Sequence, residues 1–344
     1  MKKYLLIAAS ALSLMACNKE QEVVNAPDTN NAQRAALKVE ICGTSSLTKA
    51  EAQTADEASV NNLQVFVFNE DQIDVYGTVS DAKTITLDAT TGARTIYAVV
   101  NAPDLKAVKT MSELKATLSK LTDNSRDNFV MVGSKQETLS AQSNVSIDVN
   151  RIAARVVIGK ITRKMGTAGL AALAEDKFEF VRAYLADVVA EQKYDRTLST
   201  YSQWMSSALD DSSIKTGNAL IYHKPSAAVK IAQNASHTYN QYLYCYPNAT
   251  TEDAAAARVT RLVIECKIDG AFYTFPVLLD MGVQSNKSYE IRELILTRLG
   301  NPSDGDDNID DGEDEPIVSV EIPFGVEVKD WEVVLVGNEG TVTI

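Results

Sequence analysis

Histidine is scarce in this chain: its 344 residues include two, His223 and His237. A histidine-rich metal site is therefore excluded. Basic residues are also in the minority, with 33 Lys and Arg against 46 Asp and Glu, which gives a net charge of −13. Because so acidic a protein repels phosphates and anionic lipids, we expect neither nucleic acid nor an anionic membrane surface as a partner.

The sequence also lacks the short motifs that mark common active sites. It has no GxSxG, no P-loop, no HExxH and no glycine-rich dinucleotide turn. Both histidines have tyrosines nearby and are interpreted as strand or loop residues rather than general bases. We therefore expect no catalytic residues, no cofactor and no metal ligands, and a protein that is not an enzyme.

The four cysteines do not suggest a disulfide framework or a zinc site. No pair has CxxC spacing. Cys17 belongs to the amino-terminal segment described below, and the odd number of cysteines that remain, Cys42, Cys245 and Cys266, cannot all pair in disulfides. We predict buried free thiols, with a Cys245–Cys266 bridge between neighbouring strands as the alternative.

A long apolar run stands at the amino end. Residues 4–16 follow Lys2 and Lys3 and are too few for a stable membrane-spanning helix, so they are typical of a secretory signal. The run ends in Leu-Met-Ala-Cys-Asn, which looks like a bacterial lipoprotein cleavage site. We predict removal of residues 1–16 and lipidation of Cys17, which would anchor the chain to a membrane. An ordinary signal peptide with an incidental cysteine is the alternative.

The two-residue alternation of half-buried strands dominates the rest of the chain. Strands are predicted at residues 37–42, 63–69, 82–89, 93–103, 144–149, 154–161, 241–247 and 288–299, and a hairpin at 261–279 around Asp269-Gly270. Many short strands with few helices predict an all-β chain with minor helices, built as two β-sandwich domains that meet near residues 150–155.

One helix is predicted after Thr110. Thr110 and Glu113 fit a capping box, and Leu114, Leu118 and Leu121 would form one apolar stripe along the helix.

Residues 301–315 are an acidic segment with eight acids and no basic residue. Such a composition predicts an extended, self-repelling linker. Asp306, Asn308 and Asp310 have the spacing of calcium ligands, but Asp311 stands where a calcium loop needs glycine. Calcium binding is therefore the weaker interpretation of this segment.

Beyond the acidic segment, residues 318–328 alternate strictly between apolar and polar side chains. The apolar face consists of Val318, Val320, Ile322, Phe324, Val326 and Val328. After Lys329 the parity shifts and Trp331, Val333 and Leu335 come into phase, which predicts a bulge or bend near Asp330. This strand must bury its apolar face on a sheet, either of its own chain or of another molecule.

Together these features resemble the major fimbrial subunits, or fimbrillins, of Bacteroidales-type (type V) pili. The resemblance covers most of the chain and rests on the order and spacing of several segments. These are LMACNK (14–19), ALKVEICGTSS (36–46), the polar loop and strand at 45–72 with Lys49, ARTIYAVVNAPDLKAVKTMSELKATLSKLT (93–122), RIAARVVI (151–158), NKSYEIREL (286–294) and VKDWEVVLVGNEG (328–340).

The resemblance implies a route of assembly. The subunit would be exported as a lipoprotein to the outer membrane, where a trypsin-like protease cuts the loop after the first strand. The departing strand would leave a groove, which the carboxy-terminal strand of the next subunit fills by β-strand addition.

Carried over to this chain, the resemblance makes residues 36–46 the displaced strand, with Leu37, Val39 and Ile41 on its apolar face. The cut would fall between Lys49 and Ala50. An arginine is usual at this place in the family, so the identity of the protease stays open. Arg34 is the alternative cut, but it precedes the first strand and would not remove it. The donor segment would be residues 317–336.

The implied fold is two transthyretin-like β-sandwich domains in tandem with an extended donor-strand tail. The expected parts are a signal peptide (1–16), a propeptide (17–49), an acceptor domain (50–152), a second domain (153–300), an acidic linker (301–316) and the tail (317–344).

The mature stalk subunit would lie in cell-surface fimbriae and support adhesion and biofilm. Its partners would be copies of itself, anchor and tip subunits, the maturation protease and, for the lipid-anchored precursor, the outer membrane. The alternatives are a glycan-binding surface lipoprotein that uses exposed tyrosines in 222–246, or an anchor or tip subunit.

Overall fold

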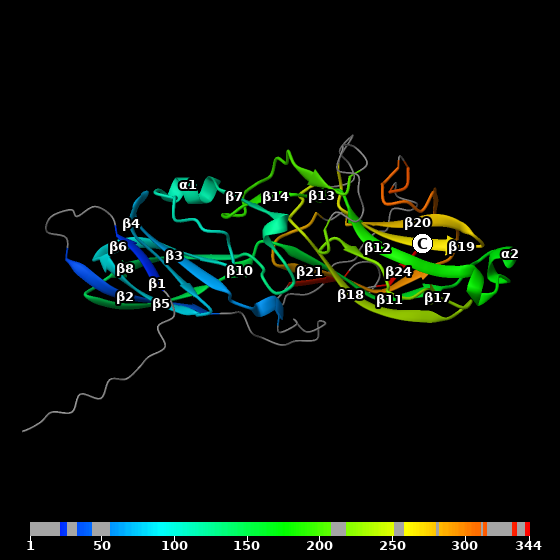
Figure 1. Ribbon diagram of the computed structural model, residues 1–344, viewed down its shortest axis with the longest axis horizontal. Coiled ribbons are helices and arrows are strands. Elements are labelled where there is room, and N and C mark those ends of the chain that lie inside the picture. The colour runs from blue at the N-terminus through cyan, green and yellow to red at the C-terminus, as the bar shows by residue number, and fades with distance from the viewer. Residues whose placement is uncertain are drawn as a thin grey trace, which may run out of the picture.

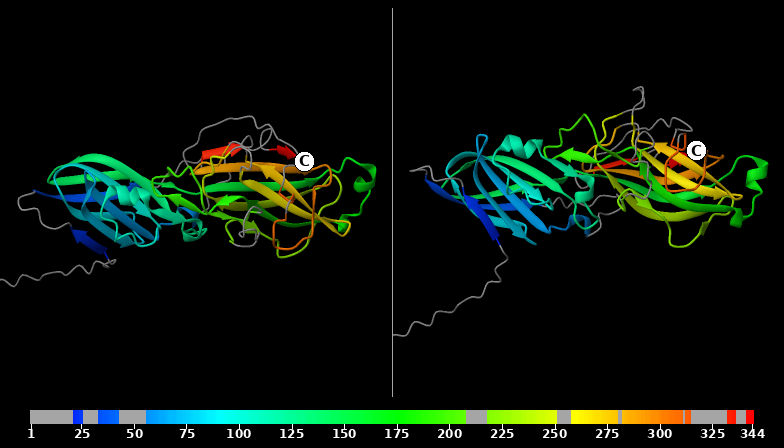
Figure 2. Two further views of the ribbon diagram at one scale, coloured as in Figure 1. Left: turned by 90° about the horizontal axis from the view of Figure 1, so that it is seen from above. Right: turned by 45° about the horizontal axis from the view of Figure 1, so that its top comes forward.

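The computed structural model describes residues 21–25, 33–42, 56–207, 218–250, 258–279, 282–310, 312–314, 332–335 and 341–344. They form an elongated molecule built mainly from β-sheets (Figures 1 and 2). The all-β prediction with minor helices is therefore confirmed.

Two sheets face each other in the amino-terminal part. The larger has the order β1 (Gln21–Asn25), β4 (Gln72–Ser80), β3 (Asn62–Asn69), β6 (Gly92–Val100), β8 (Met131–Leu139), β10 (Asn150–Arg151), and the smaller has the order β5 (Thr84–Thr90), β2 (Arg34–Cys42), β9 (Gln142–Asp148). Apolar side chains of both sheets join in one buried cluster, in which Leu63 and Val65 of β3 lie with Leu37 and Val39 of β2. This arrangement is a β-sandwich.

Two further sheets form the carboxy-terminal part. One has the order β18 (Ser236–Cys245), β11 (Ala154–Arg163), β21 (Lys287–Leu296), β23 (Glu332–Leu335), with β24 (Thr341–Thr343) also paired to β21. The other has the order β16 (Tyr222–His223), β12 (Phe178–Ala186), β19 (Arg261–Ile268), β20 (Ala271–Leu278), β22 (Asn301–Ser303), with β17 (Val229–Lys230) also paired to β12. Their apolar residues belong to a second, larger cluster.

The two parts are joined at several places. Short strands β7 (Leu118–Lys120) and β14 (Glu191–Lys193) pair across the junction, and β13 (Val188–Val189) pairs with β15 (Trp204–Met205) beside them. The larger cluster also contains amino-terminal residues, and the rings of Phe129 and Tyr244 lie 4.7 Å apart. These contacts hold the two parts end to end along the long axis (Figure 1).

Helices are few and short. They are α1 (Met111–Ala116), α2 (Ala168–Ala171) and the 3₁₀ helices η1 (Asp56–Ala58), η2 (Leu121–Asp123) and η3 (Glu175–Lys177). No helix in the described ranges has both the length and the apolar character needed to cross a membrane.

The predicted hairpin is confirmed: β19 and β20 pair in register around Asp269 and Gly270, whose φ angles are 47° and 93°. The capping box of α1 is also present, with the Thr110 side chain accepting from the Glu113 amide. The predicted stripe is wrong beyond Ala116, because Thr117 is extended and the chain turns to pair with β14. Leu118 therefore lies in β7, exposed by 43%.

The three cysteines among the described residues are free thiols, as predicted. Cys245 and Cys266 are buried, and burial raises the pKa of the Cys245 thiol to about 12. The prediction of burial is wrong for Cys42, which ends β2 and is exposed.

Candidate functional site: the β2 groove and the carboxy-terminal tail

Strand β2 occupies the centre of the smaller amino-terminal sheet. It pairs antiparallel with β5 and parallel with β9. Its burial alternates along nine residues: Ala35, Leu37 and Val39 have no exposed surface and Ile41 has 3%, whereas the residues between them are exposed. The predicted apolar face therefore points into the core of the sandwich.

Among the strands that the structure describes, β2 alone bridges its two neighbours, because β5 and β9 do not pair with each other. Each neighbouring strand in a sheet lies about 4.8 Å away, so loss of β2 would leave a slot of about 10 Å between β5 and β9. The slot would open onto the buried cluster and expose two rows of unpaired main-chain groups. Another extended strand with an apolar face would cover the buried cluster and pair with both rows of main-chain groups.

Several predicted processing residues, Cys17, Lys49 and Ala50, lie outside the described residues. Arg34 is described: it is the first residue of β2, opposite Thr90, and its Nη1 donates to the Asp88 carbonyl at 3.3 Å. Its place within a paired strand makes it a poor protease site, and a cut after it would leave the rest of β2 in the sheet.

The chain just before β3 is fixed by a buried acid, Glu57 of η1. The Arg155 guanidinium contacts its carboxylate at 3.2 Å, and the Tyr244 hydroxyl donates to it at 2.6 Å. Arg151 donates to the Glu57 carbonyl at 2.8 Å. Glu57 and Arg155 are 1% and 0% exposed. Because these partners come from β10, β11 and β18, the network ties η1 to the junction between the two parts.

The far end of the tail is docked on the protein's own carboxy-terminal sheet. β23 runs parallel to β21, with Val333 opposite Ser288 and Leu335 opposite Glu290, and β24 pairs with β21 further along (Figure 2). Val342 has no exposed surface, and the amide of Ile344 donates to the Ile295 carbonyl at 2.8 Å. The remaining predicted donor residues, 318–331, lie outside the described residues.

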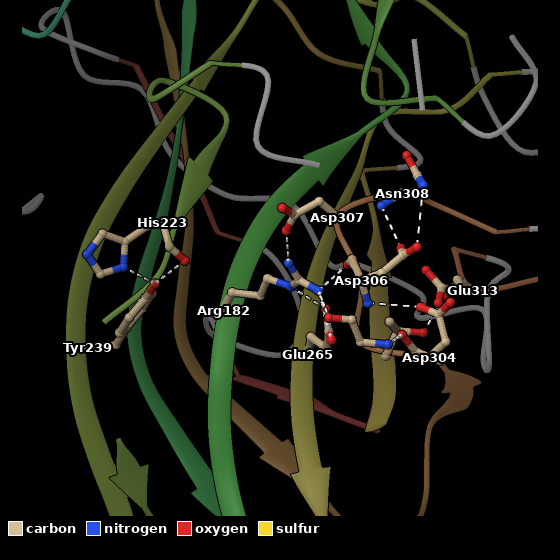
Figure 3. A network of polar contacts seen from close by, with 12 residues as sticks. Arg182, His223, Tyr239, Glu265, Asp304, Asp306, Asp307, Asn308 and Glu313 are labelled. Atoms are coloured by element: carbon tan, nitrogen blue, oxygen red, sulfur yellow. Dashed lines mark hydrogen bonds and ion pairs between the residues drawn. The ribbon is translucent and has the colours of Figure 1, made fainter. Parts of the chain in front are cut away.

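The acidic segment is not the extended linker that its composition predicts. Figure 3 shows the buried Arg182 guanidinium between Glu265 of β19 and Asp307 of the segment. The Asp307 carboxylate accepts at 2.7 Å and the Gly305 carbonyl at 2.8 Å. Burial opposes the charge on Arg182, but its hydrogen bonds to Glu265 raise its pKa above the ordinary value.

Further contacts fasten the same segment. β22 pairs with β20, Ile309 is 3% exposed, and Arg261 contacts Asp314 at 3.1 Å. The buried Arg182 and the partly buried Arg261 thus outweigh the mutual repulsion of the acids. The described residues 301–310 and 312–314 belong to the carboxy-terminal sandwich.

Comparison with known proteins supports the predicted resemblance. Residues 35–169 match the family model described as "Major fimbrial subunit protein (FimA)". The match begins inside β2, ends in α2 and leaves out β1, so this part of the chain is similar to the major fimbrial subunit family. The predicted resemblance to fimbrillins is thereby confirmed.

Two curated relatives come from Porphyromonas gingivalis. Major fimbrium subunit FimA type-3 is 26% identical over 212 residues, which cover 56% of this chain and 52% of the relative. Major fimbrium subunit FimA type-2 is 31% identical over 122 residues, which cover 35% and 30%. The chain therefore spans about half the length, or less, of these relatives. Both are named as subunits of a major fimbrium, which agrees with the prediction that this chain is not an enzyme.

Solved structures of low sequence identity share the fold. A putative cell adhesion protein from Bacteroides eggerthii is 18% identical with a TM-score of 0.59, and the match covers 90% of this chain and all of that one. A fimbrilin from Porphyromonas gingivalis is 16% identical with a TM-score of 0.57, and the match covers 81% and 95%. The all-β architecture of this chain is thus one that other proteins adopt.

A group of carboxylates could hold a metal ion. Ligand atoms of Asp304, Asp310 and Glu313 all lie within 4.8 Å of one another. Of the predicted calcium triplet, Asp310 alone belongs to this group. Asp306 instead accepts from the Asn308 amide at 2.7 Å, which serves a local turn.

The tyrosines of the glycan-binding alternative are mostly buried. Tyr239, Tyr244 and Tyr246 are 6%, 1% and 0% exposed, so the expectation of exposed tyrosines is wrong for these three. Tyr239 and His223 share a hydrogen bond (Figure 3), and burial lowers the pKa of His223.

Two functional features were not predicted from the sequence. One is the network around Glu57, a single acid in a polar loop; its arginines stand in the RIAAR segment at 151–155, which was noted only as a family landmark. The other is β1, which lies within the polar stretch after Cys17 and carries a short Val23-Val24 pair as its sole apolar signal.

Proposed function

We propose that this chain is a stalk subunit of a cell-surface fimbria that polymerises by proteolysis-triggered strand exchange. Similarity to the fimbrial subunit family model and to a curated fimbrial subunit supports the fimbrial structural role. The observation that carries the mechanism is the central position of β2, whose removal would open a slot onto the core. In this proposal Cys17 is lipidated, and the precursor is exported to the outer membrane.

The processing step is proposed at the bond between Lys49 and Ala50. Lys49 is the one basic residue between Lys38 and Lys83, so a trypsin-like protease has one site in this stretch. The cut separates the propeptide, residues 17–49, from an acceptor sandwich of residues 50–152 and a second sandwich that begins at 153. The network around Glu57 supports this site, because it would hold the new amino end in place while β2 departs.

Proteolysis acts as the switch because it changes the competition for the slot. A covalently attached β2 competes at an effective concentration of roughly millimolar. A strand from another molecule cannot displace it until the loop is cut. After the cut β2 becomes a separate peptide, and a donor strand can replace it by adding main-chain hydrogen bonds to β5 and β9.

Residues 318–328 are the proposed core of the donor strand. Their apolar face matches the alternation of β2, and the phase shift near Asp330 divides them from Trp331, Val333 and Leu335, which complete the donor. Eleven extended residues span about 36 Å. Three residues separate this segment from β23. They are too few for the segment to lie in a neighbouring molecule while β23 stays paired in its own, so β23 and β24 must first detach from β21.

Assembly of the chain lacking residues 1–17 tests the proposal. We expect limiting trypsin to produce a new amino terminus at Ala50 and then heat-resistant ladders on a gel and fibres in electron micrographs. Lys49→Ala should abolish both, and Lys49→Arg should preserve them. Deletion of residues 317–344 should leave cleavage intact and abolish the ladders. Cleavage at Lys49 without ladders in the full-tailed protein would contradict the proposal.

A further inference from the structure

The propeptide contacts both sheets of the amino-terminal sandwich. β2 fills the centre of the smaller sheet, while β1 pairs antiparallel with β4 at the edge of the larger one, from Gln21 opposite Val79 to Asn25 opposite Val75 (Figure 1). The Glu22 carboxylate also forms an ion pair with Lys106. Both strands lie upstream of the proposed cut, so both belong to the peptide that must depart.

The two strands are held in different ways. β2 buries a full row of apolar side chains, whereas Glu22 and Val23 of β1 are exposed, Val23 by 39%. The contacts described for β1 are its main-chain pairing with β4 and the ion pair to Lys106. Net contributions of such interactions are small, so β1 can detach without disturbing the core.

The edge that β1 covers is apolar and regular. Val75 and Val79 of β4 are buried, and β4 has only β3 on its other side. A regular edge strand of this kind is a template for pairing with another chain, and proteins commonly cover such edges. β1 covers this edge in the precursor.

We propose that β1 is a second latch, which retains the propeptide after the cut and covers the β4 edge until it leaves. This inference rests on the proposed function. Residues 26–33 connect the two strands, so β2 remains near its slot, at roughly millimolar effective concentration, as long as β1 stays paired. β1 would thereby set the rate at which the cleaved propeptide gives way to a donor strand.

A label on Cys42 can follow this release. Cys42 is exposed at the end of β2, whereas Cys245 and Cys266 are buried, so a thiol-reactive dye should modify Cys42 selectively in the folded chain lacking residues 1–17. Loss of dye anisotropy after complete trypsin cleavage then reports departure of the propeptide. An excess of a synthetic peptide of residues 317–336 serves as the donor.

Two variants weaken β1 in different ways. Val23→Pro combined with Val24→Pro removes two main-chain donors, and Glu22→Lys places a like charge beside Lys106. Glu20→Lys, just before β1, is the control for charge. We expect about tenfold faster release for the proline variant, which corresponds to about 1.4 kcal/mol, and several-fold faster release for Glu22→Lys. The control should match the parent.

Release at the parental rate in both β1 variants would overturn the latch while leaving the proposed function standing. Retention of the dye in the parent and in every variant, despite complete cleavage and excess peptide, would instead overturn the proposed strand exchange, and the latch with it.

Discussion

At the scale of single residues, closure of the precursor depends on a few side chains of β2. Leu37 lies opposite Leu87 of β5, and Val39 lies between Ile85 of β5 and Val145 of β9. Leu37 and Val39 are fully buried in the cluster that both sheets share. The strict alternation of the sequence was sufficient to predict which side chains face inward.

Leu37→Ala should destabilise the uncut precursor by about 2–5 kcal/mol, because it leaves a cavity in the core. Lys38→Ala, at an exposed neighbour, should change the stability by less than about 0.5 kcal/mol. Urea unfolding of the uncut proteins measures both effects. After cleavage and loss of the propeptide, the Leu37→Ala protein should unfold like the parent. A difference that persists in the mature protein would contradict the departure of β2.

Glu57 shows what single residues do not reveal in the sequence. Glu57 follows Asp56 in a polar stretch of the sequence, which is typical of an exposed loop. Glu57 is nevertheless buried against Arg155 and Tyr244. Its partners stand about a hundred residues or more downstream, and no local pattern indicates that the fold brings them together.

At the scale of elements, the sequence predicted some strands and missed others: β4, β8 and β12 were not predicted. Period-two alternation located β2, because a half-buried strand carries its pattern within itself. An apolar run located β11, and the Asp269-Gly270 turn located the β19–β20 hairpin. α1 ended early because β7 pairs with β14, and the acidic segment packed because Arg182 and Arg261 neutralise it. Those causes lie elsewhere in the chain.

The docking of β24 makes a prediction at this scale. Val342 is fully buried against β21, so Val342→Asp should loosen the end of the tail and speed polymerisation several-fold after cleavage. Thr343→Asp, at the exposed neighbouring position, is the matched control. The rate of ladder formation with the same amount of trypsin measures the effect. Slower assembly of Val342→Asp with an unchanged cleavage rate would show that docking of β24 assists the donor rather than restraining it.

At the scale of the whole molecule, the sequence predicted a mostly β-stranded chain but not the contacts that join its amino- and carboxy-terminal parts. The junction consists of the β7–β14 pair, the Phe129–Tyr244 contact and the network around Glu57, each of which links distant parts of the chain. The tail was predicted as a donor from its alternation and from the family resemblance. The structure adds that the far end of the tail pairs with β21 of its own chain, which the sequence did not indicate.

The central claim is that the tail of one molecule fills the β2 slot of another, and a complementation experiment tests it most directly. The Lys49→Ala variant keeps its tail but cannot open its slot, and the cleaved variant lacking residues 317–344 has an open slot but no tail. Each should remain monomeric alone. Mixed, they should form a heat-resistant dimer and nothing longer. A mixture that stays monomeric, or a dimer formed by either variant alone, would contradict strand exchange.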